Sequence, residues 1–308
     1  ENSSSIEVDE DYFNEANISP FYKDYIEQEF LSEIPNKNAY TVNIPNKVGN
    51  KNITEIKEGL FSGYDVINEI LIEPNIRIKS TNIPEGIKKI GKTTEDSDFV
   101  AGVFLYNFHL SEVNFPSTLK EIGINDFYFS SITDIVIPKS VETIGIQAFA
   151  EVFPFNSLTF EGANDRTSQL ETIGASAFAT DLGLPEIIPE INLIIPASVK
   201  TISTFAFVGI PLASLTFAGT STDGSGNDSS LLVNIGRKAF DLNNQNHTIY
   251  LPSTLTNVGS RAFDKASLAS IYINKLTIPE TFDSVWSNDA KKYILNGTGG
   301  YTCIENCS

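Results

Sequence analysis

Two short hydrophobic patterns alternate along most of the chain. The first spaces three apolar residues as apolar-x-x-apolar-x-apolar and is often followed by proline, as at Ile132, Ile135 and Ile137 before Pro138. The second reads Ile-Gly-x-x-Ala-Phe, as at residues 144–149. Because the two patterns recur together many times, the sequence predicts a solenoid, in which one small unit is repeated and stacked on the next.

The first pattern predicts one short β-strand in each coil. Side chains alternate between the two faces of a strand, so Ile135 and Ile137 should point inward and Val136 outward. Stacked strands would form a parallel sheet with its inner face on the core and its outer face open. The proline cannot donate a hydrogen bond to a neighbouring coil and ends the strand. Further copies are expected at residues 67–72 and 268–273, with turns or short helical segments on the other side of each coil.

The second pattern predicts a tight corner followed by a buried aromatic ring. Its glycine marks the corner. Ser203 and Lys57 replace that glycine in two copies, so we expect no left-handed backbone there, which would cost another residue about 1–2 kcal/mol. The alanine leaves room for close coil packing, and the rings should stack as a structural spine. The predicted spine residues are Phe61, Phe104, Phe127, Phe149, Phe178, Phe207, Phe240 and Phe263.

The spacing of the second pattern separates tight coils from coils with insertions. The shortest spacings are 22 residues, from Ile122 to Ile144, and 23 residues, from Ile235 to Val258. Longer spacings contain polar stretches that we expect to be surface loops, because doubling a loop's length costs only about 0.6 kcal/mol. These insertions are residues 92–100, 161–169, 181–190 and 219–230.

The repeat is expected to occupy residues 41–285, with a different segment at each end. In the acidic segment 1–40, Ser19 and Pro20 can start a helix over residues 19–33. That helix either covers the first coil, as the end of a solenoid requires, or serves as a linker or a partner-binding arm.

The C-terminal segment, residues 286–308, follows the last clear repeat. It contains Trp286 and Tyr293, which we expect to close the end of the solenoid. It also contains both cysteines, Cys303 and Cys307. They either form a disulfide in an oxidising compartment or remain two free thiols.

The chain is strongly acidic, with a net charge of −18 from 39 acidic and 21 basic residues. Half of that charge lies in residues 1–33, where ten acidic side chains accompany Lys23 alone. Nucleic acids and anionic membrane surfaces are bound through Lys and Arg, so we expect neither as a partner. No apolar run reaches the roughly 20 residues of a membrane-spanning helix. Methionine is absent even at position 1, so we expect that the natural start was removed and that any signal or anchor segment lies outside this sequence.

Residues that could carry catalysis or bind a metal are sparse. His109 and His247 fall beside different strands, and we expect both at the surface. No nucleophile, nucleotide or zinc motif is present, so we expect neither an enzyme nor a cofactor or metal site. Residues 223–228 resemble a calcium loop only faintly, because the sixth position is Asp228 instead of glycine and the twelfth is Asn234 instead of glutamate. A flexible polar insertion is the better interpretation.

The combined pattern resembles the BspA-like leucine-rich repeats, in which strand-Ile-Pro, Ser-Val-x-x-Ile-Gly and Ala-Phe blocks recur at about 23 residues. The match spans roughly residues 41–285 and is most specific over 110–263, although the cysteine that often follows Ala-Phe in the family is missing. The resemblance implies an α/β-type leucine-rich-repeat solenoid. It also implies a secreted or surface-anchored protein of bacteria or some parasitic protists, in a family associated with adhesion to host proteins and other cells.

The open face of the strands is the predicted binding surface. Alternation places one uncharged residue at the centre of each strand, although the chain is acidic. Exposed aromatic and aliphatic side chains together favour an interface, whereas β-propensity alone would also place such residues in strands. The candidate ligand-binding residues are Asn114, Val136, Thr159, Ile194, Thr216, Tyr250 and Tyr272.

Two functions are compatible with this face. The first is that a monomer outside the cell or on its surface binds a protein or glycan ligand, such as a host extracellular molecule, with Tyr250 and Tyr272 as anchors. The alternative is a structural spacer that presents another domain of a larger surface protein. A localised aromatic patch favours binding, and a uniformly polar face favours the spacer. Asn-x-Ser/Thr sequons, for example at Asn52, Asn246 and Asn296, are about as frequent as the composition alone predicts and do not establish glycosylation.

Overall fold

The computed structural model describes residues that all lie in one compact unit, Tyr40–Ser308. The helix predicted over residues 19–33, nearly all of the acidic segment, and His247 lie outside the described residues. The described residues are 40–48, 50–62, 64–65, 70–71, 78–94, 101–152, 155–180, 189–241, 248–263, 270–287 and 290–307.

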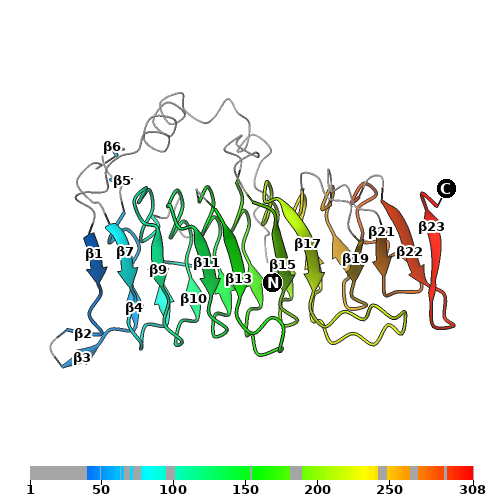
Figure 1. The fold of residues 1–308 in the computed structure, drawn as a ribbon, viewed down its shortest axis with the longest axis horizontal. Coiled ribbons are helices and arrows are strands. Elements are labelled where there is room, and N and C mark those ends of the chain that lie inside the picture. The colour runs from blue at the N-terminus through cyan, green and yellow to red at the C-terminus, as the bar shows by residue number, and fades with distance from the viewer. Residues whose placement is uncertain are drawn as a thin grey trace. The chain divides into compact units, whose positions relative to one another are not determined.

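One side of the unit is a row of short parallel strands, which we call the strand side (Figure 1). The strands pair within four groups, β1-β7-β9, β11-β13, β15-β17 and β19-β21-β22. Ile135 and Ile137 are buried and Val136 is 45% exposed, so the predicted alternation is confirmed. The strands are β1 (Tyr40–Asn43), β7 (Ile78–Asn82), β9 (Glu112–Asn114), β11 (Asp134–Ile137), β13 (Ser157–Phe160), β15 (Ile191–Ile195), β17 (Leu212–Phe217), β19 (Thr248–Leu251), β21 (Ser270–Ile273) and β22 (Lys291–Leu295).

Each coil also contains a second strand, formed by the two residues that precede the corner. Thr143 and Ile144, for example, pair with residues of the coils on both sides. These strands form one continuous eight-stranded parallel sheet. The repeat predicts only the first strand, because a two-residue strand is too short to show alternation. The strands are β4 (Glu55–Ile56), β8 (Lys89–Ile90), β10 (Glu121–Ile122), β12 (Thr143–Ile144), β14 (Thr172–Ile173), β16 (Thr201–Ile202), β18 (Asn234–Ile235) and β20 (Asn257–Val258).

Three antiparallel pairs complete the described part of the fold. They join β2 (Lys47–Val48) to β3 (Lys51–Asn52), β5 (Tyr64–Asp65) to β6 (Ile70–Leu71), and β22 to β23 (Tyr301–Glu305).

These pairs correct one prediction, namely that the copy of the first pattern at residues 67–72 supplies a strand of the row. Within the described residues β6 pairs with β5, and β7 supplies the strand of the row between β1 and β9. Ile83 after β7 is followed by Pro84, the proline typical of the other strands, whereas Ile72 is followed by Glu73. The proline was therefore the better guide to the strand than the spacing of apolar residues.

The remaining side of each coil consists of turns, and the described residues there contain no helix. These turns place the eight predicted phenylalanines in the core. Their rings stack in chain order with neighbouring centroids 5.0–5.5 Å apart. All are fully buried except Phe61, at the first coil. Trp286 packs edge-on against Phe263, 6.1 Å away, at the far end of the spine.

Close approach between coils is what requires glycine at most corners. A Cβ atom on Gly145 would lie 2.6 Å from the carbonyl carbon of Gly123 in the preceding coil. Lys57 is tolerated because it follows β4, which is the first strand of the eight-stranded sheet. Gly91 is the one corner with a positive φ, 61°. In most coils the left-handed residue lies two positions after the corner, for example Gln147 after Gly145, with φ 52°. The sequence does not predict this.

Replacing Gly145 with alanine should lower the free energy of unfolding by about 1–3 kcal/mol, because the added methyl meets backbone atoms that cannot rotate away. Urea denaturation followed by circular dichroism measures the loss. Ser203→Gly is the matched control, since Ser203 occupies the equivalent corner of another coil and already carries a Cβ atom. This change should alter stability by less than about 1 kcal/mol. A Gly145→Ala protein as stable as the wild type would contradict the close coil contact.

Candidate ligand-binding face

The seven candidate residues all lie in strands of the strand side, at outward positions. Alternation therefore places them on one face, but their exposure differs. The exposed residues are Asn114, Val136, Thr159 and Thr216, and the half-buried ones are Ile194, Tyr250 and Tyr272.

The first part of this face is a ladder of asparagines at Asn43, Asn82 and Asn114. The side-chain amide of Asn114 donates to Oδ1 of Asn82 at 2.8 Å, and that of Asn82 donates to Oδ1 of Asn43 at 3.2 Å. The Asn114 amide also donates to Glu112 at 3.1 Å. Because a ligand would have to displace these bonds, Asn114 is the least available of the seven candidates.

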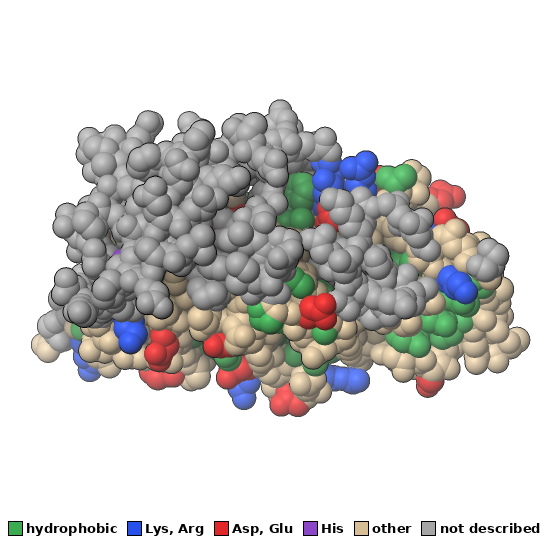
Figure 2. Space-filling view, turned by 45° about the horizontal axis from the view of Figure 1, so that its top comes forward, with side chains coloured by type: hydrophobic (Ala, Val, Ile, Leu, Met, Phe, Trp, Pro, Cys, Tyr) green, Lys and Arg blue, Asp and Glu red, His purple; other side chains and the backbone are tan. Residues whose placement is uncertain are grey.

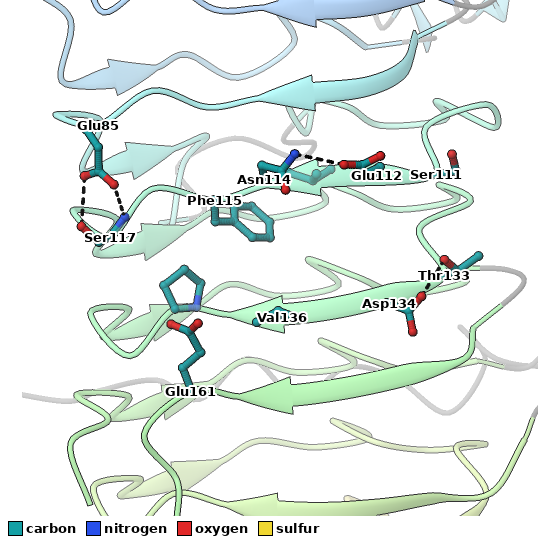
Figure 3. Close-up of a pocket in the computed structure, with 12 residues that line it drawn as sticks. Glu85, Ser111, Glu112, Asn114, Phe115, Ser117, Thr133, Asp134, Val136 and Glu161 are labelled. Carbon is teal, nitrogen blue, oxygen red and sulfur yellow. Dashed lines mark hydrogen bonds between the residues drawn. The ribbon is translucent and has the colours of Figure 1, made fainter. Parts of the chain in front are cut away.

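A groove of about 860 Å³ separates β9 from β11 (Figure 3). The two strands do not pair with each other, since β9 pairs with β7 and β11 pairs with β13. Two of the candidates, Asn114 and Val136, line the groove from opposite sides. The other lining residues are Glu85, Ser111, Glu112, Val113, Phe115, Ser117, Thr133, Asp134, Pro138 and Glu161.

The groove is negatively charged. Four carboxylates line it, and its lining contains no Lys or Arg. The backbone N–H of Ser117, assisted by its hydroxyl, donates to Glu85 and lowers the pKa of that carboxyl. The Ser157 hydroxyl and the Asn156 amide lower the pKa of Asp134 in the same way. Both carboxyl groups are therefore ionised at neutral pH.

The last part of the face is a cluster of four tyrosines, Tyr250, Tyr272, Tyr293 and Tyr301. The Tyr272 ring stacks between the Tyr250 ring, 4.9 Å away, and the Tyr293 ring, 4.5 Å away. Tyr301 meets Tyr272 edge-on at 4.7 Å. In Figure 2, hydrophobic side chains gather at the end of the unit that carries β19 to β22. Since the stacked rings cover one another's faces, the row presents ring edges and hydroxyl groups to solvent.

The insertion at residues 219–230 is tied to this cluster by hydrogen bonds. The Tyr301 hydroxyl donates to Oδ1 of Asn274 at 2.5 Å, and the Asn274 amide donates to Oδ1 of Asp228 at 2.7 Å. Oδ2 of Asp228 accepts a bond from the backbone N–H of Ser253. Burial raises the pKa of Tyr301 to about 12, so its hydroxyl remains a donor at neutral pH. The insertion is thus fixed against later coils instead of being a free polar loop.

Sequence reasoning placed two of the four tyrosines on this face and missed the other two. Tyr293 matches no copy of either pattern, so the sequence places it only in the closing segment, although β22 continues the row by one more strand. Tyr301 lies on this face because an antiparallel hairpin pairs it with Leu295. The signal for that hairpin was the Asn296-Gly297 dipeptide, a common turn sequence.

The described residues offer little for chemistry. No group of three or more His, Cys, Asp and Glu among them could hold a metal ion. In the calcium-like stretch, Asp223 already accepts bonds from Ser221 and Ser225. Cys303 and Cys307 form a disulfide, with Cα atoms 5.9 Å apart, which decides between the two alternatives. Within the part of the chain that the structure describes, no helix is long and apolar enough to cross a membrane.

Solved structures similar to this chain include several bacterial leucine-rich-repeat proteins. One from Bacteroides ovatus is 20% identical with a TM-score of 0.48, and the match covers 80% of this chain and 61% of that one. A leucine-rich cell surface protein from Faecalibacterium prausnitzii is 16% identical with a TM-score of 0.40, over 87% and 54% of the two chains. The pneumococcal vaccine antigen PcpA is 20% identical with a TM-score of 0.34, over 77% and 72%.

Comparison with protein families gives a direct match. No curated protein sequence matches the chain. The family model for the BspA type leucine-rich repeat region matches in six copies, over residues 32–151, 75–191 and 167–291. These ranges contain all eight spine phenylalanines, and they cover most of the chain. The chain belongs to the BspA-type leucine-rich-repeat family.

Proposed function

We propose that this protein is secreted or displayed on a cell surface and binds a protein or glycan ligand through the exposed face of its strand side. The tyrosine cluster is the observation that carries the proposal. Membership of the BspA-type family supports it, and one of the similar solved structures is described as a cell surface protein.

The tyrosine cluster has the properties of a binding anchor. Tyrosine is enriched at the energetic centres of interfaces because it combines a large apolar ring with a hydroxyl that forms hydrogen bonds. Tyr250, Tyr272 and Tyr293 are held in place by their own stacking and by Tyr301. A ligand would therefore order few side chains on binding, which lowers the entropy cost of association.

The spacer is the second candidate function, and the asparagine ladder is the observation that favours it. There the outward amides are bonded to one another along the row of strands, which leaves a polar face with few free groups. A spacer needs no more than such a face. The tyrosines at the opposite end of the row have no comparable purpose in a spacer, and for that reason we favour binding.

Tyr250→Ala combined with Tyr272→Ala should weaken ligand binding by at least about tenfold, because each anchor residue contributes on the order of 2 kcal/mol. Surface plasmon resonance with a ligand taken from an array of host matrix proteins and glycans measures the change. Tyr128→Ala, in a turn away from the strand side, is the matched control and should bind like the wild type. Equal affinity of the double variant, with an unchanged circular dichroism spectrum, would refute a role for the tyrosines.

A further inference from the structure

The coils on either side of the groove separate only on the strand side. In the spine, Phe127 lies 5.3 Å from Phe104 and 5.0 Å from Phe149, so the rings are as close here as elsewhere. In the eight-stranded sheet, β10 pairs with both β8 and β12. Between β9 and β11, by contrast, no pairing exists, and Figure 3 shows a wider space there than between β11 and β13. The row of strands therefore has a local opening.

The floor of this opening is apolar and incompletely covered. Val113 of β9 and Phe115, the residue directly after β9, face inward, and both are only half-buried. The corresponding residues of β11, Ile135 and Ile137, are each 1% exposed. The Phe115 ring lies between the two strands in Figure 3, and it contacts Phe149 of the next coil edge-on at 6.3 Å.

The walls of the opening are two free strand edges. The carbonyl groups of Thr133 and Ile137 accept hydrogen bonds from the coil of β13. In a parallel strand, alternate peptide groups point to opposite neighbours, so those of Asp134 and Val136 are turned toward β9. An unpaired edge with free N–H and C=O groups is the feature that binds an extended peptide by strand addition.

The outer rim of the opening selects the charge of such a peptide. Glu112 and Asp134 stand on β9 and β11. Glu85, after β7, and Glu161, after β13, accept backbone hydrogen bonds from the residues that follow β9 and β11, and the lining residues include no cation. The acidic segment 1–33, at −9, and a second copy of this chain, at −18, would both be repelled. Charge complementarity therefore favours a cationic segment of another protein.

We propose that the groove binds an extended peptide of another protein, inserted as a strand between β9 and β11, with alternating basic and apolar residues. Its basic side chains meet Glu112 and Asp134, and its apolar side chains cover Val113 and Phe115. This deepens the proposed function, on which it rests, because the groove lies on the same face. It uses none of the tyrosines.

Fluorescence anisotropy with a labelled Lys-Val-Lys-Val-Lys-Val-Lys peptide tests the proposal on the full chain. The wild type should bind this peptide saturably. The same peptide with N-methylated valines, which has equal charge but lacks the N–H donors of one edge, should bind at least about tenfold more weakly. No saturable binding below about 1 mM, or equal binding of the two peptides, would overturn the insertion of a strand.

Variants of the rim separate this site from the tyrosine cluster. Glu112→Gln combined with Asp134→Asn should weaken peptide binding at least about tenfold. Glu142→Gln combined with Glu171→Gln removes the same charge from exposed ion pairs outside the groove and should leave binding unchanged within about twofold. Equal losses in both double variants would overturn the site. The Tyr250→Ala and Tyr272→Ala protein should still bind the peptide, so failure of the groove and failure of the tyrosine anchors give different results.

Discussion

Replacing Phe178 with alanine is expected to lower the free energy of unfolding by about 3–5 kcal/mol. Phe178 is 1% exposed, and its ring lies between Phe149 and Phe207, with each centroid 5.3 Å away. Phe160 also packs against it edge-on at 5.9 Å. The neighbouring coils are held apart by strand pairing on both sides of β14, so they cannot close the cavity that the missing ring would leave.

Urea denaturation followed by circular dichroism measures this loss for the whole row of coils. Trp286 fluorescence, recorded in parallel, reports on the C-terminal end, where that side chain packs against Phe263. Leu231→Ala is the control, because Leu231 is 49% exposed and its loss should cost well below about 1 kcal/mol. A Phe178→Ala protein that loses less than about 1 kcal/mol would contradict the continuous spine.

Raising the pH from 4 to 8 is expected to destabilise the protein through Asp126, by about 4 kcal/mol. Asp126 replaces the alanine of the second pattern, and it is completely buried. Burial raises the pKa of its carboxyl from 3.8 to about 7, although the backbone N–H groups of Val103 and Gly123 donate to it and act in the opposite direction. The unfolded chain releases this proton near pH 4 and the folded chain near pH 7, so the contribution of Asp126 to stability is largest below pH 4 and declines until pH 7 is passed.

Asp126→Ala should remove this pH dependence. The variant should be less stable than the wild type at pH 4, where Val103 and Gly123 lose their acceptor, and should gain on the wild type as the pH rises. Exposed carboxyl groups with lowered pKa values, such as Asp165, favour the folded state at higher pH in both proteins. Their effect therefore cancels when the stability of the variant is subtracted from that of the wild type. Parallel stability curves for the two proteins, measured by urea denaturation from pH 4 to 8, would contradict a buried, protonated Asp126.

The fold was largely predictable because phenylalanine recurs at one structural position of the repeat. Phe follows Ala in most coils, and the ring at each such position, for example Phe207 or Phe240, is stacked in the core. The second sheet was not predicted, because Thr143 and Ile144 form too short a strand for periodicity to show. The left-handed turns at residues such as Gln147 were not predicted either, since no glycine marks them.

The candidate site was predictable only where it follows the repeat. Tyr250 and Tyr272 occupy equivalent places in adjacent coils, so alternation found them. Tyr301 comes from a hairpin outside the repeat, and only the tertiary fold brings it to the other rings. The groove leaves no mark on the spacing: β9 and β11 begin 22 residues apart, at Glu112 and Asp134, like the tightly packed coils. Lost pairing between strands is a property of packing that no local pattern records.

Binding by the strand side is tested most directly by screening the purified protein against host matrix proteins and glycans on arrays, with the Tyr250→Ala and Tyr272→Ala protein alongside. We expect saturable binding of the wild type to at least one protein or glycan, and a weaker signal from the variant at the same spot. Absence of binding to every protein and glycan would contradict a binding function and favour the spacer, and undiminished binding by the variant would place the ligand elsewhere on the molecule.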